Sequence, residues 1–284
     1  MMGQDGPWGT VLNSLPFFGS YGGVLSDDEN AKAALWAVYR EATECNGVAA
    51  STIISNPLDT QESPAAGDIL DFRIGQFTPM SFIGDTEPAL LNRIDATARR
   101  NVRTAQRSGV TVSVENDNLR DLMDIHRENI ISIGGRHKPD QFFTLLPRHF
   151  SSGKEYRVYV ARIDGEIVAA LLLLYSGNVV EYFIPGTLHG YRAQQPSALL
   201  LFRAMTEAAH DGYRLWNWGG TWLNQDGVLR FKRKWGAIDR TYRYHTRIRN
   251  TELLNQSPAD LLANYGYFYV VPFSSLIAIK GSYS

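Results

Sequence analysis

The stretch that most constrains the fold is residues 167–175, I-V-A-A-L-L-L-L-Y, an apolar run without a charge. A short apolar run between turn signals is typical of a strand that is buried on both faces. Asp164-Gly165 precedes the run and S-G-N at residues 176–178 follows it, and both predict tight turns. We therefore expect residues 156–163, 167–175 and 179–184 to form a meander of three strands.

Helical periodicity predicts helices on both sides of this meander. The predicted helices span residues 87–109, 116–134, 141–149, 197–211 and 228–235, with further strands at residues 215–218 and 241–249. A meander followed by a crossover helix and another strand is an α+β arrangement. Nearer the N-terminus, Asp28 is a candidate cap for a helix in which Leu35 and Val38 fall at helical spacing, and residues 49–55 and 68–78 predict strands.

Composition sets broad limits on the class of protein. The 284 residues suffice for one large or two small domains, and the formal net charge of -1 excludes a basic coat over the whole chain but not a local basic patch. The single cysteine, Cys45, predicts a reduced, cytoplasmic and metal-free protein. No signal peptide is apparent, and no apolar run approaches the roughly 20 residues that span a bilayer.

Residues 215–236 combine aromatic residues, a glycine pair and positive charge. The stretch reads L-W-N-W-G-G-T-W-L-N-Q-D-G-V-L-R-F-K-R-K-W-G and contains Trp216, Trp218 and Trp222. Gly219-Gly220 is expected to end a strand, and the basic run that follows is expected to form a helix. Aromatic residues beside cations indicate a site for an anionic ligand. The tryptophans either stack a terminal adenine or belong to the core.

Four stretches together resemble the FemABX-type, or lipid II:glycine glycyltransferase-like, branch of the GNAT superfamily. They are P-F-F-G-S-Y-G-G-V-L at residues 16–25, R-R-N-V-R-T-A-Q-R-S-G-V at 99–110, residues 190–213, and residues 216–236 with their Phe-Lys pair. The resemblance implies two GNAT-like lobes around a cleft. It assigns residues 1–115 to a reduced first lobe, residues 116–250 to a complete second lobe, and residues 251–284 to a segment that returns to the first lobe.

The resemblance also implies the reaction, which is transfer of an acyl group, often aminoacyl from aminoacyl-tRNA, to a free amine without a cofactor. The acceptor in the family is typically a nucleotide-linked or lipid-linked peptidoglycan peptide. Because few residues precede the P-F-F-G loop, a peptide natural product, such as a peptidyl nucleoside antibiotic intermediate, is an alternative acceptor to a peptidoglycan precursor. We expect a monomer without a membrane span.

Aminolysis of an ester passes through a tetrahedral oxyanion, which needs a positive or hydrogen-bonding group beside it. The resemblance assigns this contact to Lys232, which follows Phe231; the alternative is a surface lysine. Glu181 and Asp226 are candidates for the general base. The remaining residues expected to bind substrate are Arg136, Lys138, Phe142, Tyr182, Arg192, Asn217, Trp218 and Gly219.

The expected donor follows from residues 192–197, R-A-Q-Q-P-S, which occupy the place of the acyl-CoA signature Q/R-x-x-G-x-G/A. Gln195 and Ser197 stand at the two glycine positions. Pro196 has no backbone N–H that could donate a hydrogen bond to a pyrophosphate. The sequence therefore favours aminoacyl-tRNA, with candidate RNA contacts at Arg230, Arg233, Lys234, Arg243 and Arg247. An acyl-CoA-dependent N-acyltransferase and a non-catalytic GNAT-like RNA- or peptide-binding module remain as alternatives.

Overall fold

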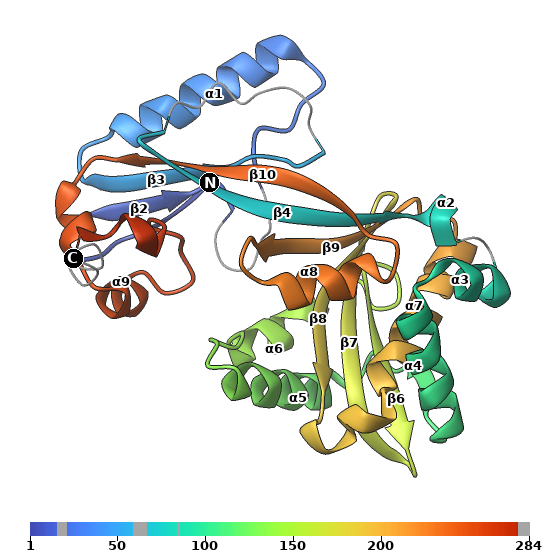
Figure 1. Cartoon of the computed structure of the whole chain (residues 1–284). Coiled ribbons are helices and arrows are strands. Elements are labelled where there is room, and N and C mark those ends of the chain that lie inside the picture. Colours follow the sequence, from blue (N-terminus) through green and yellow to red (C-terminus); the bar gives the residue numbers. More distant parts are fainter. Residues whose placement is uncertain (16–21, 59–66, 84–85, 278–284) are drawn as a thin grey trace. The chain divides into compact units, whose positions relative to one another are not determined.

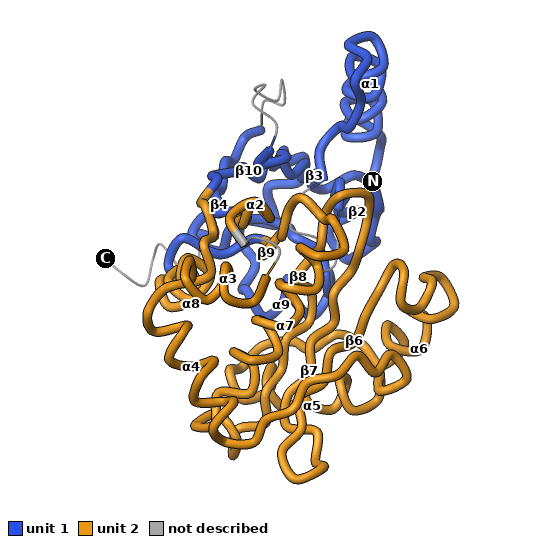
Figure 2. Tube along the Cα trace, turned by 90° about the vertical axis from the view of Figure 1, so that its right-hand side faces the viewer, with its two compact units in different colours: residues 1–75, 220–224, 240–284 blue, residues 76–219, 225–239 orange. Residues whose placement is uncertain are grey.

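The computed structural model describes residues 1–15, 22–58, 67–83 and 86–277 (Figure 1). The chain divides into two compact units, of which unit 1 comprises residues 1–75, 220–224 and 240–284, and unit 2 comprises residues 76–219 and 225–239 (Figure 2). The chain passes between the units within β4 (Ile69–Pro79), β9 (Leu215–Trp222) and β10 (Ile238–Ile248), and once more between residues 224 and 225. The predicted boundary at residue 115 thus falls inside unit 2, and the one at residue 250 falls inside unit 1.

Unit 2 is built on strands in the order β9-β8-β7-β6-β5. The predicted meander is confirmed as β6 (Tyr156–Ile163), β7 (Glu166–Ser176) and β8 (Val179–Thr187), and β5 (Thr111–Val114) extends it. Neighbours from β5 to β8 pair antiparallel, whereas β9 runs parallel to β8. The turn residues Asp164, Gly165 and Gly177 have φ angles of 50°, 84° and 52°, as tight turns require.

Helices cover both faces of this sheet, and β7 shows why its sequence is apolar throughout. Ala169, Leu171 and Leu173 pack in the core that includes α4 (Ala96–Arg107) and α7 (Pro196–His210). Ala170 and Leu172 pack in the core formed with α5 (Leu119–Ser132) and α6 (Asp140–His149). Alternate side chains of one strand therefore enter two separate cores, as predicted for a strand buried on both faces.

The predicted helix over residues 87–109 is two helices, α3 (Glu87–Arg93) and α4. The break falls at Ile94-Asp95, where the Asp95 side chain accepts a hydrogen bond of 2.7 Å from the amide of Thr97. The Asp95 amide also donates to the carbonyl of Lys234, at 2.9 Å. An aspartate in the middle of a helical pattern has thus acted as the cap of a new helix.

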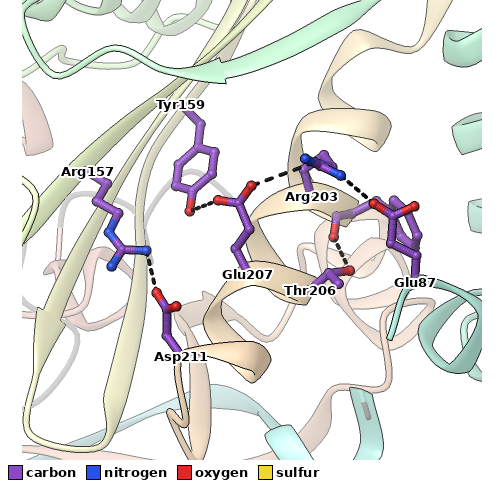
Figure 3. Close-up of polar contacts among 8 residues, drawn as sticks. Glu87, Arg157, Tyr159, Arg203, Thr206, Glu207 and Asp211 are labelled. Carbon is purple, nitrogen blue, oxygen red and sulfur yellow. Dashed lines mark hydrogen bonds and ion pairs between the residues drawn. The ribbon is translucent and has the colours of Figure 1, made fainter. Parts of the chain in front are cut away.

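Polar contacts fix α7 against its neighbours, as Figure 3 shows. Tyr159 of β6 donates to Glu207 at 2.9 Å, and Arg157 pairs with Asp211 at 2.7 Å. Arg203 of α7 forms an ion pair with α3. These contacts hold α7 in register with the sheet, and thereby fix the position of the residues at its N-terminal end.

Unit 1 contains strands in the order β1-β2-β3-β10-β4, with β1 (Met2–Gln4), β2 (Thr10–Asn13) and β3 (Val48–Ile54). Strands β2 and β3 are parallel, and β10 pairs antiparallel with β3. The strands predicted at residues 49–55, 68–78 and 241–249 are confirmed, whereas the two N-terminal strands were not predicted. The C-terminal Leu261 and Tyr265 pack in one core with Val11 and Ala50.

Helix α1 (Glu29–Glu44) begins as predicted, because Asp28 accepts a hydrogen bond from the amide of Ala31 at 2.8 Å. The apolar residues at helical spacing do not form a buried face, since Leu35 and Val38 are 46% and 59% exposed. The remaining helical segments are α2 (Met80–Ile83), α8 (Asp226–Arg233), α9 (Pro258–Asn264) and the 3-10 turns η1 (His189–Gln194), η2 (Thr251–Asn255) and η3 (Phe273–Ser275). The predicted α+β class is confirmed. No helix in the described ranges is long and apolar enough to cross a bilayer.

Candidate active site

The candidate site lies in unit 2, where β8 and β9 are paired. Residues 179–181 pair with residues 215–217, and Glu181 with Asn217 is the last of these pairs although both strands continue. Helix α8 follows β9 and carries Lys232. Two strands and one helix therefore supply a carboxylate, an amide and an ammonium group to one region of unit 2.

Lys232 and Glu181 interact electrostatically in this region. Lys232 is only 5% exposed, and its burial lowers its pKa to about 8 in spite of the opposing effect of the Glu181 and Asp239 carboxylates. Burial raises the pKa of Glu181 to about 7, against the effect of Lys232 and of a hydrogen bond from Asn217. A carboxylate and an ammonium group thus coexist close to neutral pH, and each is near the point at which it exchanges a proton.

Asn217 orients the carboxylate of this pair. Its side-chain nitrogen donates to Glu181 Oε2, and its side-chain oxygen accepts a hydrogen bond of 2.9 Å from the amide of Gly219. Gly219 has a φ of 72°, a conformation that strains any residue with a Cβ. The positive φ of Gly219 lets its backbone N–H point back to the Asn217 side chain. This hydrogen bond fixes the Asn217 side-chain amide, which contacts Glu181.

Aromatic residues next to these polar groups in the sequence form a cluster. The ring centroids of Tyr182 and Trp218 lie 5.0 Å apart, and Phe231 stands edge-on to Trp218 at 6.1 Å. Trp216 and Trp218 are 0% and 2% exposed, so both are core residues. Burial raises the pKa of Tyr182 above its usual range, so that its hydroxyl stays neutral. Phe231 is 39% exposed and is the cluster's accessible member.

A second group of predicted residues gathers on the α5–α6 side of the sheet. Lys138 is 6% exposed, and its Nζ lies 4.5 Å from the ring centroid of Phe183 and 5.8 Å from that of Phe142. Burial lowers the pKa of Lys138 to about 7. Its amide donates to Nε2 of His126, whose pKa is lowered to about 4 by burial and by the charge of Lys138. Arg136, in the loop before α6, is exposed.

The segment expected to replace the acyl-CoA signature forms η1 and the start of α7. Arg192 donates to the side-chain oxygen of Asn129 at 3.4 Å. Gln195 has a φ of 57° and Pro196 is the first residue of α7. The hydroxyl of Ser197 forms a hydrogen bond with that of Thr187. A side chain occupies each signature glycine position, and the first turn of α7 has one backbone donor fewer than an ordinary helix.

The predicted RNA-contacting residues fall in both units. Arg230, Arg233 and Lys234 belong to unit 2, whereas Arg243 and Arg247 belong to unit 1. Arg233 pairs with Asp239 at 3.2 Å, and Arg247 pairs with Glu44 at 3.0 Å. Arg230 and Arg243 are exposed, and Lys234 is half-buried. The basic run of the sequence is therefore partly neutralised by acidic neighbours.

Three further observations complete the account of the predicted site. Asp226, the other candidate base, is exposed at the start of α8. Residues 16–21 of the first family stretch lie outside the described residues. Within the described part of the chain, no group of three or more His, Cys, Asp or Glu side chains is arranged to hold a metal ion.

Sequence reasoning missed the residues that hold α8. Gln76 donates to Asp239 at 2.9 Å and to the carbonyl of Leu229 at 3.2 Å. Thr78 donates to the carbonyl of Trp235 at 3.1 Å and accepts a hydrogen bond from the indole of Trp218. Gln76 and Thr78 are both 0% exposed. Buried polar residues such as Gln76 and Thr78 show that buried partners exist, but the sequence does not identify those partners.

The comparisons with known proteins assign the family. A profile described as "Acetyltransferase (GNAT) domain" matches residues 92–233, half of the chain. The chain belongs to this family. The matched range contains Glu181, Asn217 and Lys232, so that the candidate site lies within the GNAT domain. No curated protein sequence matches the chain significantly.

Solved structures show the same fold at low sequence identity. FemX has a TM-score of 0.62 at 14% identity, over 86% of this chain and 81% of FemX. The C-terminal domain of an Agrobacterium fabrum protein assigned as a lysylphosphatidylglycerol synthetase has a TM-score of 0.58 at 17% identity. The match covers 95% of this chain and 86% of that domain. L-PGS from Bacillus licheniformis has a TM-score of 0.54 at 15% identity, and the match covers 93% of this chain and 84% of the L-PGS chain. The predicted FemABX-type fold within the GNAT superfamily is thereby confirmed.

Proposed function

We propose that the protein is a tRNA-dependent aminoacyltransferase. It transfers an aminoacyl group from the ester of aminoacyl-tRNA to the free amine of a peptide-type acceptor, which is a peptidyl natural product such as a peptidyl nucleoside antibiotic intermediate, or a peptidoglycan precursor. An amide bond forms, the ester bond breaks, and the 3′-terminal hydroxyl of the tRNA is released.

The observation that carries this proposal is the interacting pair of the half-buried Glu181 and the buried Lys232 in the GNAT domain. The Glu181 carboxylate takes a proton from the acceptor ammonium group, which leaves a nucleophilic amine. The Lys232 ammonium group stabilises the oxyanion that forms when the amine attacks the ester carbonyl. The second proton of the amine passes to the departing tRNA oxygen as the tetrahedral intermediate collapses.

The start of α7 supports an ester donor over an acyl-CoA donor. Backbone amides at a helix N-terminus are the usual ligands of a pyrophosphate. Here Pro196 removes one donor, and Gln195 and Ser197 place side chains where the acyl-CoA signature has glycines. The fold likeness to FemX and to the lysylphosphatidylglycerol synthetase agrees with this donor, since the product named for the latter carries an aminoacyl group.

Acyl-CoA-dependent N-acylation is the second candidate, because the matched family is described as an acetyltransferase domain. The chemistry at Glu181 and Lys232 would be the same, with a thioester in place of the ester. The two candidates therefore differ in donor and not in catalytic residues.

One assay separates these functions. The protein is incubated with a pool of aminoacyl-tRNAs or with acetyl-CoA, together with peptides that carry free amines, and new products are sought by mass. We expect product from aminoacyl-tRNA. Product from acetyl-CoA alone would replace the proposal by the second candidate. If charged tRNA binds but no product forms with either donor, the protein is a binding module instead.

Variants of the same assay test the catalytic pair. Lys232→Ala is expected to lower the rate by about 10²–10³, which is typical of losing one oxyanion contact. The exposed Lys154, also in unit 2, provides the matched control, and Lys154→Ala should leave the rate unchanged. A Lys232→Ala protein with near-normal rate would remove Lys232 from the mechanism.

A further inference from the structure

A second carboxylate that interacts with Lys232 belongs to Asp239, at the start of β10. The negative charges of Glu181 and Asp239 both oppose the lowering of the Lys232 pKa by burial. Glu181 comes from β8, whereas Asp239 follows α8, the helix that carries Lys232. The proposed proton transfer uses Glu181 only, so Asp239 has a different role.

Hydrogen bonds connect Asp239 to α8 at two places. Its Oδ1 accepts a hydrogen bond of 2.9 Å from Gln76, and the same Gln76 nitrogen donates to the carbonyl of Leu229 at 3.2 Å. Its Oδ2 accepts from Arg233, whose Nε lies 3.2 Å away. Residues 229, 232 and 233 have the i, i+3 and i+4 spacing that places them on one side of a helix. Asp239 is therefore connected to the turn of α8 that contains Lys232.

The burial of Lys232 explains why a second carboxylate is needed. An ammonium group that leaves water loses its hydration, and nearby negative charge compensates this loss. The pKa of Lys232 is lowered to about 8 even with both carboxylates present. In the proposed reaction Glu181 becomes neutral when it takes the acceptor proton, just before the oxyanion forms. Asp239 takes no part in that transfer, so its charge remains while Lys232 stabilises the oxyanion.

The charged side chains on α8 itself do not replace this carboxylate. The charged residues on α8 and at its C-terminal end, besides Lys232, are Asp226, Arg230, Arg233 and Lys234. Three of these four are cations, and a like charge lowers the pKa of an ammonium group. Asp226 is exposed in the first turn of the helix. The neighbouring strands β4 and β9 contribute the neutral amides of Gln76 and Asn217. Asp239 compensates Arg233 directly and thereby also weakens the effect of that cation on Lys232.

We propose that Asp239 is a positioning residue for Lys232: it fixes the last turn of α8, and its negative charge keeps the ammonium group protonated throughout the reaction. The proposal rests on the proposed function for the role of Lys232 as the oxyanion contact. The effect of Asp239 on the charge of Lys232 is a property of the folded chain and needs no substrate.

A titration of Lys232 in the full chain, without donor or acceptor, tests the proposal. Lysine side chains are isotope-labelled, the Lys232 signal is identified by its loss in Lys232→Arg, and its titration midpoint is measured by NMR. Asp239→Asn removes the charge with little change in size, and Asp239→Glu keeps the charge. Asp211→Asn is the matched control, because Asp211 also pairs with an arginine of unit 2, Arg157.

Asp239→Asn is expected to lower the midpoint of Lys232 by about 1 pH unit, which is typical of the loss of one nearby opposite charge. Asp239→Glu and Asp211→Asn should leave the midpoint close to that of the unchanged protein. In the transfer assay, the alkaline limb of kcat/KM should move down by the same amount in Asp239→Asn, a shift that a loss of folded protein does not produce. An unchanged midpoint in Asp239→Asn overturns the proposal.

Arg233→Gln provides a second test if Asp239→Asn does not fold, because Arg233 is exposed. Loss of this cation leaves the Asp239 charge uncompensated, so the midpoint of Lys232 should rise. An unchanged or lowered midpoint in Arg233→Gln would also overturn the proposal.

The two measurements separate this proposal from the proposed function. Midpoints that shift as expected without transfer from either donor would support the effect of Asp239 on Lys232 and refute the proposed function. Transfer with the same Lys232 midpoint in every variant would refute the role of Asp239 alone.

Discussion

The Glu181–Lys232 pair predicts a bell-shaped dependence of the transfer rate on pH. Glu181 must be deprotonated to act as a base, and its pKa of about 7 places the acid limb there. Lys232 must be protonated to stabilise the oxyanion, and its pKa of about 8 places the alkaline limb there. We therefore expect kcat/KM to rise through pH 7 and to fall through pH 8.

Variants assign each limb of this profile. Glu181→Gln should lower the rate and abolish the acid limb, whereas Lys232→Arg should keep part of the rate and shift the alkaline limb upward, because a guanidinium group stays protonated. The comparison is made from about pH 5 to about pH 10 with one acceptor. An acid limb that persists in Glu181→Gln would mean that another group, such as the acceptor amine, titrates there.

At the level of single residues, the resemblance selected Lys232 as the proposed oxyanion contact through its place after Phe231, and it left Glu181 and Asp226 as two candidates for the base. The reason is that Glu181 meets its partner only through the pairing of β8 with β9, which brings Glu181 opposite Asn217. Asp226 lies close to Lys232 in the sequence, yet it is exposed. The two candidates therefore differ in exposure, and only the half-buried Glu181 has a raised pKa.

At the level of elements, strands and helices with strong periodicity were predicted well, and the errors fall at residues with two possible roles. The sequence pattern places Asp95 inside one long helix, but in the structure its side chain caps the start of a new helix, α4. Gly219-Gly220 was expected to end a strand, yet β9 continues to Trp222. Glycine is unfavourable in strands, so its presence there requires a local reason such as a close neighbour.

That local reason gives a prediction for Gly220. A Cβ at this position would overlap the hydroxyl of Tyr242, which is buried on β10 within unit 1. Gly220→Ala should therefore lower the free energy of unfolding by about 1–3 kcal/mol, the range seen for overpacking. Thermal and denaturant unfolding measure the effect.

Two further variants test the cause. Gly227→Ala in α8 is the matched control, because a Cβ there meets no atom within 4 Å and should raise stability by about 0.4–1 kcal/mol. Adding Tyr242→Phe to Gly220→Ala should recover part of the loss, relative to Tyr242→Phe alone. If the loss is not recovered, the overlap with the hydroxyl is not its cause.

At the level of the whole molecule, the order of elements from residue 87 to 249 was sufficient to predict the α+β class and the GNAT relationship. The residue ranges of the two units could not be predicted from the sequence, because each of the strands β4, β9 and β10 contributes residues to both units. The short strands β1 and β2 were also missed. Met2–Gln4 and Thr10–Asn13 are too short for a periodic pattern, and they are strands only because β3 and the C-terminal core lie beside them.

The distribution of charge over the molecule gives the last prediction, which concerns RNA binding by a chain of net charge -1. An arginine that already pairs with a carboxylate gains less from a phosphate than an exposed arginine without such a pair. In unit 2, Arg230 is exposed on α8, whereas Arg233 pairs with Asp239. In unit 1, Arg243 is exposed, whereas Arg247 pairs with Glu44. Each unit thus contains its own matched pair of arginines.

We expect Arg230→Gln and Arg243→Gln to weaken tRNA binding more than Arg233→Gln and Arg247→Gln do. Each effective loss should also reduce the slope of log K against log salt by roughly 0.7–0.9, the contribution of one phosphate contact. Filter binding of tRNA at several salt concentrations provides both quantities. Equal effects within a pair would mean that the carboxylate partners do not compete with RNA. An unchanged slope of log K against log salt in all four variants would place the RNA contacts on other residues. The change in this slope is what distinguishes a lost phosphate contact from a loss of folded protein, which would weaken binding without changing the slope.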